Sequence, residues 1–132
     1  MIVADTSVWI AYFTGTEPSV RVALRALIRR GRVALVGVVL AELLQGCRTP
    51  NEAETILSTL TGLHFLDTTF SSWKRTGELG SLLRRKGITL PLSDLIIGAV
   101  AMDHKCQVFT LDIHFRQIPG VKLYRPPRLE KR

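Results

Sequence analysis

The chain has 132 residues, of which 46% are hydrophobic, and this is the size of one ordinary domain with enough apolar side chains for a core. Such a composition excludes an intrinsically disordered protein. The net charge of +7 favours a polyanionic partner, although a basic surface can also serve solubility alone. We predict a single domain over residues 1–132, in which residues 125–132 form a basic tail.

The sequence favours a protein of the cytoplasm. No uncharged apolar run approaches the roughly 20 residues that span a bilayer, and the longest candidate, 33–47, is interrupted by Glu42. The apolar start of the chain contains Asp5 and lacks the basic leader of an export signal. We therefore expect no contact with a membrane.

The first half of the chain alternates short apolar runs with helical patterns. Its predicted elements, in chain order, are a strand over 2–4, helices over 7–13 and 18–30, a strand over 33–36, and helices over 38–48 and 50–60. Thr6 or Ser7 is expected near the cap of the first helix. Pro18 suits the first turn of the second helix, and Gly31 suits its end.

The second half continues the same alternation. Its predicted elements are a strand over 63–66, helices over 68–86 and 91–104, a strand over 107–110, and a candidate fifth strand over 121–124. Gly87 is expected to stop the longest helix. Strands that alternate with helices predict an α/β fold, with a parallel sheet and helices on both of its faces.

Two acidic residues follow predicted strands. Asp5 ends the run 2–4, where burying a carboxylate is costly unless something binds it, and the alternative is an N-cap for the following helix. Asp112 lies in a turn after another strand, a common structural position, and Thr110 beside it could hold a carboxylate or have no role. Because ligands of open parallel sheets bind beyond the carboxyl ends of strands, both acids are site candidates.

Two further acidic residues lie in predicted helices. Glu42 has no cationic neighbour three or four positions away, so it either reaches water at a helix edge or serves as a ligand or acid–base group. Asp94 lies in a first helical turn, where the helix dipole favours an acid, while Gly98 and Ala101 on its face would allow close packing. Several converging carboxylates must take up protons or bind a cation, and hard oxygen ligands suit Mg²⁺ or Mn²⁺.

The segments that carry these four acids resemble the PIN-domain nucleases and, within them, the VapC-type toxins of toxin–antitoxin pairs. The resemblance rests on VADTSVWI (3–10), VLAELLQG (39–46), LSDLIIGA (92–99) and TLDIHF (110–115). No single segment is very specific, but the four in this order and spacing extend over nearly the whole chain. The resemblance implies a three-layer α/β/α fold with a central, mostly parallel sheet.

The resemblance also implies a Mg²⁺- or Mn²⁺-dependent endoribonuclease that is usually dimeric and is inhibited by a small antitoxin protein. The implied catalytic residues are Asp5, Glu42, Asp94 and Asp112, of which Asp5, Asp94 and Asp112 hold the metal, with Ser7 and Thr110 as supporting hydroxyls. Many members carry a further acid where this chain has His114, and this departure removes one implied ligand of a second metal ion.

The chemistry expected of such a site is hydrolysis of an RNA phosphodiester bond. A bound cation can lower the pKa of the attacking water and neutralise charge on the phosphate. The basic cluster of Arg84, Arg85 and Lys86 is a candidate for RNA phosphate contacts, and the alternative is a solvated helix end. Two other functions stay open: a non-catalytic PIN-like RNA-binding module, and a phosphatase-like hydrolase with Asp5 as nucleophile. The second class usually carries another Asp two residues on, where this chain has Ser7.

Overall fold

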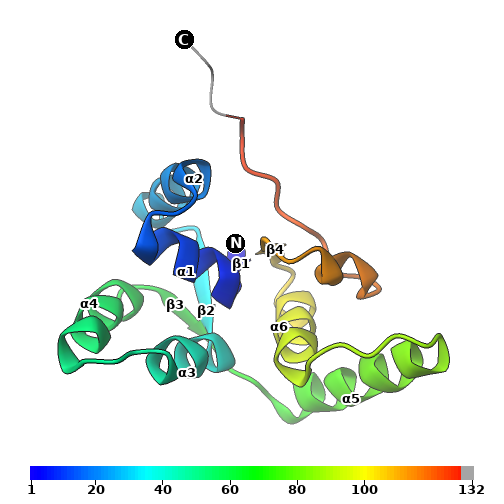
Figure 1. Ribbon diagram of the computed structural model, residues 1–132. Coiled ribbons are helices and arrows are strands. Elements are labelled where there is room, and N and C mark those ends of the chain that lie inside the picture. The colour runs from blue at the N-terminus through cyan, green and yellow to red at the C-terminus, as the bar shows by residue number, and fades with distance from the viewer. Residues whose placement is uncertain (129–132) are drawn as a thin grey trace.

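The computed structural model describes residues 1–128, which fold around a four-stranded sheet (Figure 1). The strands are β1 (Ile2–Ala4), β2 (Val33–Val36), β3 (His64–Leu66) and β4 (Gln107–Phe109). Their order across the sheet is β3-β2-β1-β4, and all three neighbouring pairs are parallel. Every residue of β1 and β2 is buried, as expected of central strands covered on both faces. The predicted parallel sheet is confirmed.

The candidate fifth strand over 121–124 is wrong as a full strand. Leu123 forms only an isolated parallel bridge with Val108, on the outer side of β4. The Val108 N–H donates to the Lys122 carbonyl, and the Tyr124 N–H donates to the Val108 carbonyl. The pairing stops there because Pro126 and Pro127 follow and have no N–H groups to continue a ladder. Of the predicted basic tail, residues 129–132 lie outside the described residues.

Within residues 1–128, six α-helices occupy the predicted positions, with their ends shifted slightly. They are α1 (Thr6–Thr14), α2 (Pro18–Arg29), α3 (Gly37–Gln45), α4 (Pro50–Leu60), α5 (Phe70–Arg85) and α6 (Leu92–Asp103). Gly31 and Gly87 have φ angles of 66° and 77°, the left-handed conformation that ends a helix and favours glycine. A short 3₁₀ helix (Ile113–Gln117) was not predicted.

The start of α1 differs from the prediction. Its N-cap is Asp5, whose side chain accepts a hydrogen bond from the Val8 N–H, rather than Thr6 or Ser7. Aspartate is among the best capping residues because its oxygen satisfies an N–H group that has no partner within the helix. Asp5 therefore fulfils the structural role that the sequence offered as an alternative, whatever further role it has.

The helices form layers on the two sides of the sheet. The chain steps in one direction from β1 to β2 to β3 and then returns across the sheet to β4. Right-handed crossovers place the helices of the outward and return connections on opposite faces. Figure 1 shows α1 and α2 on one side, with α5 and α6 on the other, while α3 contacts both α1 and α6. This is the three-layer α/β/α arrangement.

Side-chain hydrogen bonds join α5 to α6. The fully buried Ser72 donates its hydroxyl to Asp103 Oδ2 at 2.7 Å, and Arg75 Nε lies 2.8 Å from Asp103 Oδ1. These contacts fix the long helix against the helix that carries Asp94. Within residues 1–128, no helix is both long enough and apolar enough to cross a membrane.

Candidate active site

The parallel pairing of β1 with β4 places Asp5 beside Thr110. Ala4 pairs with Phe109 in the register of the sheet, so the residues that follow them emerge side by side at the carboxyl ends of the two strands. The Asp5 N–H donates to the Phe109 carbonyl, and the Thr110 hydroxyl donates to Asp5 Oδ2 at 2.6 Å. Two residues that are 105 positions apart in the sequence thus form the centre of the candidate site.

The Asp5 carboxylate is held by three donors. Its Oδ1 accepts from the Ser7 hydroxyl at 2.6 Å and the Val8 N–H at 3.1 Å, while within residues 1–128 Oδ2 accepts only from Thr110. Burial raises the pKa of Asp5, against the hydrogen bonds from Ser7, Thr110 and Val8, which favour the ionised form. Because a carboxylate has about four lone-pair positions, Oδ2 keeps one for a further partner.

The Glu42 side chain is held by a residue in the first turn of α1. The Thr6 hydroxyl donates to Glu42 Oε1 at 2.8 Å, which joins the start of α1 to α3. The sequence predicted Thr6 only near the cap of the helix, and its contact with Glu42 was not predicted. The sequence did contain one indication of this contact, since Thr6 lies between Asp5 and Ser7. A hydroxyl group at the carboxyl end of β1 can reach a residue on the helix that follows β2.

Asp112 is held on the loop after β4. The Asp112 N–H donates to the Thr110 hydroxyl oxygen, so Thr110 bridges Asp5 and Asp112. The Asp112 Oδ1 atom accepts from the His114 N–H and lies 2.7 Å from His114 Nδ1. The histidine that replaces a further acid is therefore a direct partner of Asp112.

Asp94 is the acid whose proton affinity responds most clearly to the others. Burial, together with the charges of Asp112, Asp5 and Glu42, raises the pKa of Asp94 from 3.8 to about 6, while His114 acts in the opposite direction. Asp94 lies in the first turn of α6, close enough to Asp5 and Asp112 for their charges to act on it. The structure therefore brings Asp5, Glu42, Asp94 and Asp112, hereafter the four acids, within electrostatic reach of one another.

The donor chemistry of the four acids fits a hard divalent cation, since all their donors are carboxylate oxygens and their charges repel without a cation. Asp5 Oδ2 also retains an acceptor position. Among residues 1–128, however, no group of three or more His, Cys, Asp or Glu side chains is already arranged to hold a metal ion. A cation would therefore require the carboxylates to rearrange around it.

The predicted basic cluster lies apart from the four acids, at the C-terminal end of α5. Arg84 and Arg85 are in the last turn of this helix and line a pocket against α6, while Lys86 caps the helix and does not line that pocket. Sequence analysis identified the three cations as one cluster, and the structure separates Arg84 and Arg85 from Lys86.

Comparison with known protein families agrees with this parallel α/β/α fold and with the position of its carboxylates. Residues 2–121 match the model of the PIN domain, and the chain belongs to this family. The match begins at β1 and extends past the 3₁₀ helix, so it includes all four acids.

Individual relatives are named as VapC ribonucleases. Ribonuclease VapC11 from Mycobacterium tuberculosis is 28% identical over 125 residues, covering 92% of this chain and 93% of the relative. Ribonuclease VapC21 from the same organism is 30% identical over 107 residues, covering 79% and 78%. A chain in the structure of VapBC2 from Rickettsia felis, bound to a promoter DNA fragment, is similar with a TM-score of 0.81 and 26% identity, covering 94% and 98%.

Proposed function

We propose that this protein is a Mg²⁺- or Mn²⁺-dependent endoribonuclease of the VapC type, the toxin of a toxin–antitoxin pair. The observation that supports the proposal most directly is the pKa of Asp94, which is raised by burial and by the charges of three other carboxylates at the end of a parallel sheet. Uncompensated carboxylates destabilise a fold, and groups with perturbed pKa values cluster at functional sites. The relatives named as ribonucleases supply the reaction class.

Asp5, Asp94 and Asp112 would hold the cation, and Glu42 would be a further ligand or would orient the attacking water. When bound, the cation would neutralise charge on the phosphate and lower the pKa of that water. Ser7 and Thr110 position Asp5 through hydroxyl hydrogen bonds, and Thr6 does the same for Glu42. Such bonds fix the orientation of a ligand, and their loss typically costs about 10- to 100-fold in metal affinity or activity.

The test of this proposal is cleavage of structured RNA by the purified chain, freed of any copurified protein. We expect cutting with Mn²⁺ or Mg²⁺, products with a 5′ phosphate and a 3′ hydroxyl, and no cutting with EDTA. Undiminished activity in EDTA would contradict metal dependence. RNA binding without cleavage under both cations would support the non-catalytic module instead, and a trapped aspartyl-phosphate would support the phosphatase-like hydrolase.

We propose that the chain forms a homodimer and that a small antitoxin protein inhibits it in the cytoplasm. A pocket of about 640 Å³ lies beside Glu42, and Ile10 and Phe13 of α1, Leu43 of α3 and Ile56 of α4 line it. This apolar surface next to one of the four acids suits a protein segment that covers the site. The relatives of known structure include VapBC complexes.

This partner surface can be tested with Ile10, whose side chain is 51% exposed. Ile10→Glu should abolish copurification with a protein encoded next to this gene, while RNA cleavage persists. Val22, which is 55% exposed on α2, gives the matched control, and Val22→Glu should retain the partner. If both variants still copurify with the partner, the partner binds elsewhere on the protein.

Light scattering tests the homodimer. The purified chain at micromolar concentration should give twice the 14.7 kDa monomer mass, and a monomer would contradict the dimer.

A further inference from the structure

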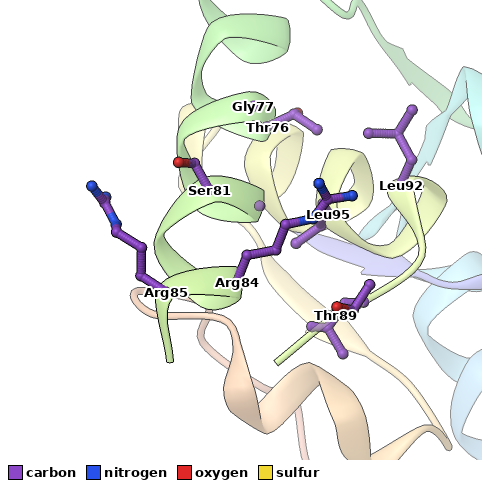
Figure 2. A pocket seen from close by; sticks show the side chains of 10 residues that line it. Thr76, Gly77, Ser81, Arg84, Arg85, Thr89, Leu92 and Leu95 are labelled. Atoms are coloured by element: carbon purple, nitrogen blue, oxygen red, sulfur yellow. The ribbon is translucent and has the colours of Figure 1, made fainter. Parts of the chain in front are cut away.

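A pocket of about 560 Å³ lies between the C-terminal half of α5 and the start of α6 (Figure 2). Its volume falls within the range of small-ligand pockets, roughly 300–1,000 Å³. Arg84 and Ser81 contribute from α5, Thr89 from the loop between the helices, and Leu92 and Leu95 from α6. Within the described residues 1–128, the lining contains no acidic side chain.

Two glycines keep this pocket open. Gly77 and Gly80 lie on the same face of α5 as Arg84, at helical spacings of three and four residues. A Cβ at Gly77 would meet nothing within 4 Å, while a Cβ at Gly80 would lie 3.2 Å from Leu95 Cδ1. Glycine in a helix interior costs about 0.5–1 kcal/mol relative to alanine, so the open space is maintained against helix stability.

The pocket combines a cation with an apolar wall. Figure 2 shows the Arg84 side chain reaching into the space between α5 and α6, whereas Arg85 points away from α6. Arg84 forms no ion pair within residues 1–128, and the side chain of Leu92 beside it is 63% exposed. A guanidinium group binds phosphate through its forked donors and stacks on planar groups, so this combination suits a nucleotide.

The pocket and the four acids share one helix, α6. Leu92 and Leu95, which line the pocket, lie on either side of Asp94 in the first turns of α6. Asp94 follows Leu92 by two positions and precedes Leu95 by one, so this part of α6 carries the pocket wall and an acid of the site on different faces. We propose that this pocket is a nucleotide subsite separate from the four acids, which binds one nucleotide of the RNA strand with its phosphate on Arg84. The assignment of RNA rests on the proposed function.

The test measures binding of a fluorescein-labelled, single-stranded RNA of mixed sequence by anisotropy in EDTA, where no cleavage is expected. Arg84→Ala should raise the Kd about 3- to 10-fold and reduce the slope of log K against log salt by about 0.7, the value of one phosphate contact on a single strand. Arg29→Ala is the matched control, because Arg29 is also an exposed arginine in the last turn of a helix. It should leave Kd and slope unchanged.

A second variant tests the space itself without changing charge. Gly77→Leu replaces a poor helix former by a good one and fills the pocket, so it should fold normally and still weaken RNA binding several-fold. Wild-type Kd values for both Arg84→Ala and Gly77→Leu would overturn the subsite. A change in oligomeric mass on Gly77→Leu would also overturn it, because the pocket would then be an interface between copies.

These experiments distinguish failure of the subsite proposal from failure of the proposed nuclease function. Wild-type protein that cleaves RNA, with variants that bind RNA normally, would reject the subsite and retain the nuclease. Wild-type protein that fails to cleave RNA, with weakened binding by both variants, would retain the subsite and reject the nuclease.

Discussion

Millimolar Mn²⁺ should raise the melting temperature of this protein by about 10 °C. A cation that binds only the folded state stabilises it by RT ln(1 + [L]/Kd), which is about 2.7 kcal/mol at a hundredfold excess over Kd. For a domain of this size, that free energy corresponds to a shift on the order of 10 °C. The physical cause is the repulsion among the four acids, which is present in the folded protein and is relieved by the cation.

Asp94→Asn should act in the opposite way from an ordinary substitution at a partly buried position. The pKa of Asp94 is about 6 in the folded protein and near 3.8 when unfolded, so the folded state favours the neutral carboxyl group. Ionisation of Asp94 therefore costs no stability below about pH 4, costs progressively more as the pH rises from 4 to 6, and costs the full amount at pH 7. Asn is neutral at every pH, so Asp94→Asn should stabilise the metal-free protein at pH 7.

The size of this gain is roughly 1–2 kcal/mol, after allowing for the solvent that reaches a partly exposed group. It exceeds the loss of a favourable helix-dipole interaction, about 0.3–1 kcal/mol, which is all that Asp94 would contribute if it were only a first-turn acid of α6. Thermal melts at pH 5 and pH 7 should show the stabilisation by Asp94→Asn mainly at pH 7. The same variant should reduce the Mn²⁺ shift.

Asp67→Asn is the matched control for these melts, because Asp67 also follows a strand, β3, but is exposed. It should leave both the metal-free melting temperature and the Mn²⁺ shift unchanged. If wild-type protein is indifferent to millimolar Mn²⁺ and Mg²⁺, and Asp94→Asn is destabilising at pH 7, the four acids do not form a cation site.

Asp5→Asn should reduce RNA cleavage more than about 100-fold, with little change in fold. Loss of a group that only orients a metal ligand typically costs 10- to 100-fold in activity, and loss of a ligand should cost more. Asn keeps an oxygen that can accept from the Val8 N–H, so the cap of α1 survives the substitution. The far-ultraviolet circular dichroism spectrum and the melting temperature check that the variant folds.

Thr110→Val gives the graded comparison in the same cleavage assay. It removes the hydroxyl that donates to Asp5 Oδ2 and accepts from the Asp112 N–H, so we expect a loss of roughly 10- to 100-fold. Thr110→Ser keeps the hydroxyl and should restore most of the activity. Asp67→Asn again serves as the control and should cleave at the wild-type rate. Full activity of Asp5→Asn would exclude Asp5 from metal binding and catalysis.

Local sequence patterns were sufficient for most of the secondary structure. The buried runs that became β1 and β2 contain only apolar residues, and no other element suits such short stretches. Gly31 and Gly87 end their helices because a residue with a φ angle near +70° is strained unless it is glycine. The parallel sheet followed from the alternation of strands and helices, since parallel strands need a crossover between them.

The candidate site could be predicted in its residue types but not in its contacts. Carboxylates after strands and in a first helical turn indicated chemistry, while each also had a structural explanation that local sequence could not exclude. Asp5 proved to be a helix cap as well as a member of the four acids, so the two explanations were compatible. The Thr6–Glu42 hydrogen bond joins residues 36 positions apart, and no local sequence pattern predicts such a bond.

The sequence by itself determined where the strands and helices form, because apolar periodicity, proline and glycine act within a few residues. Only the tertiary structure decided the strand order β3-β2-β1-β4, which places Asp5 beside Thr110. It also reduced the segment 121–124 to a single bridge and opened the pocket between α5 and α6. These features depend on which distant surfaces pack together, and the free energy of that packing is shared over the whole core rather than carried by any short segment.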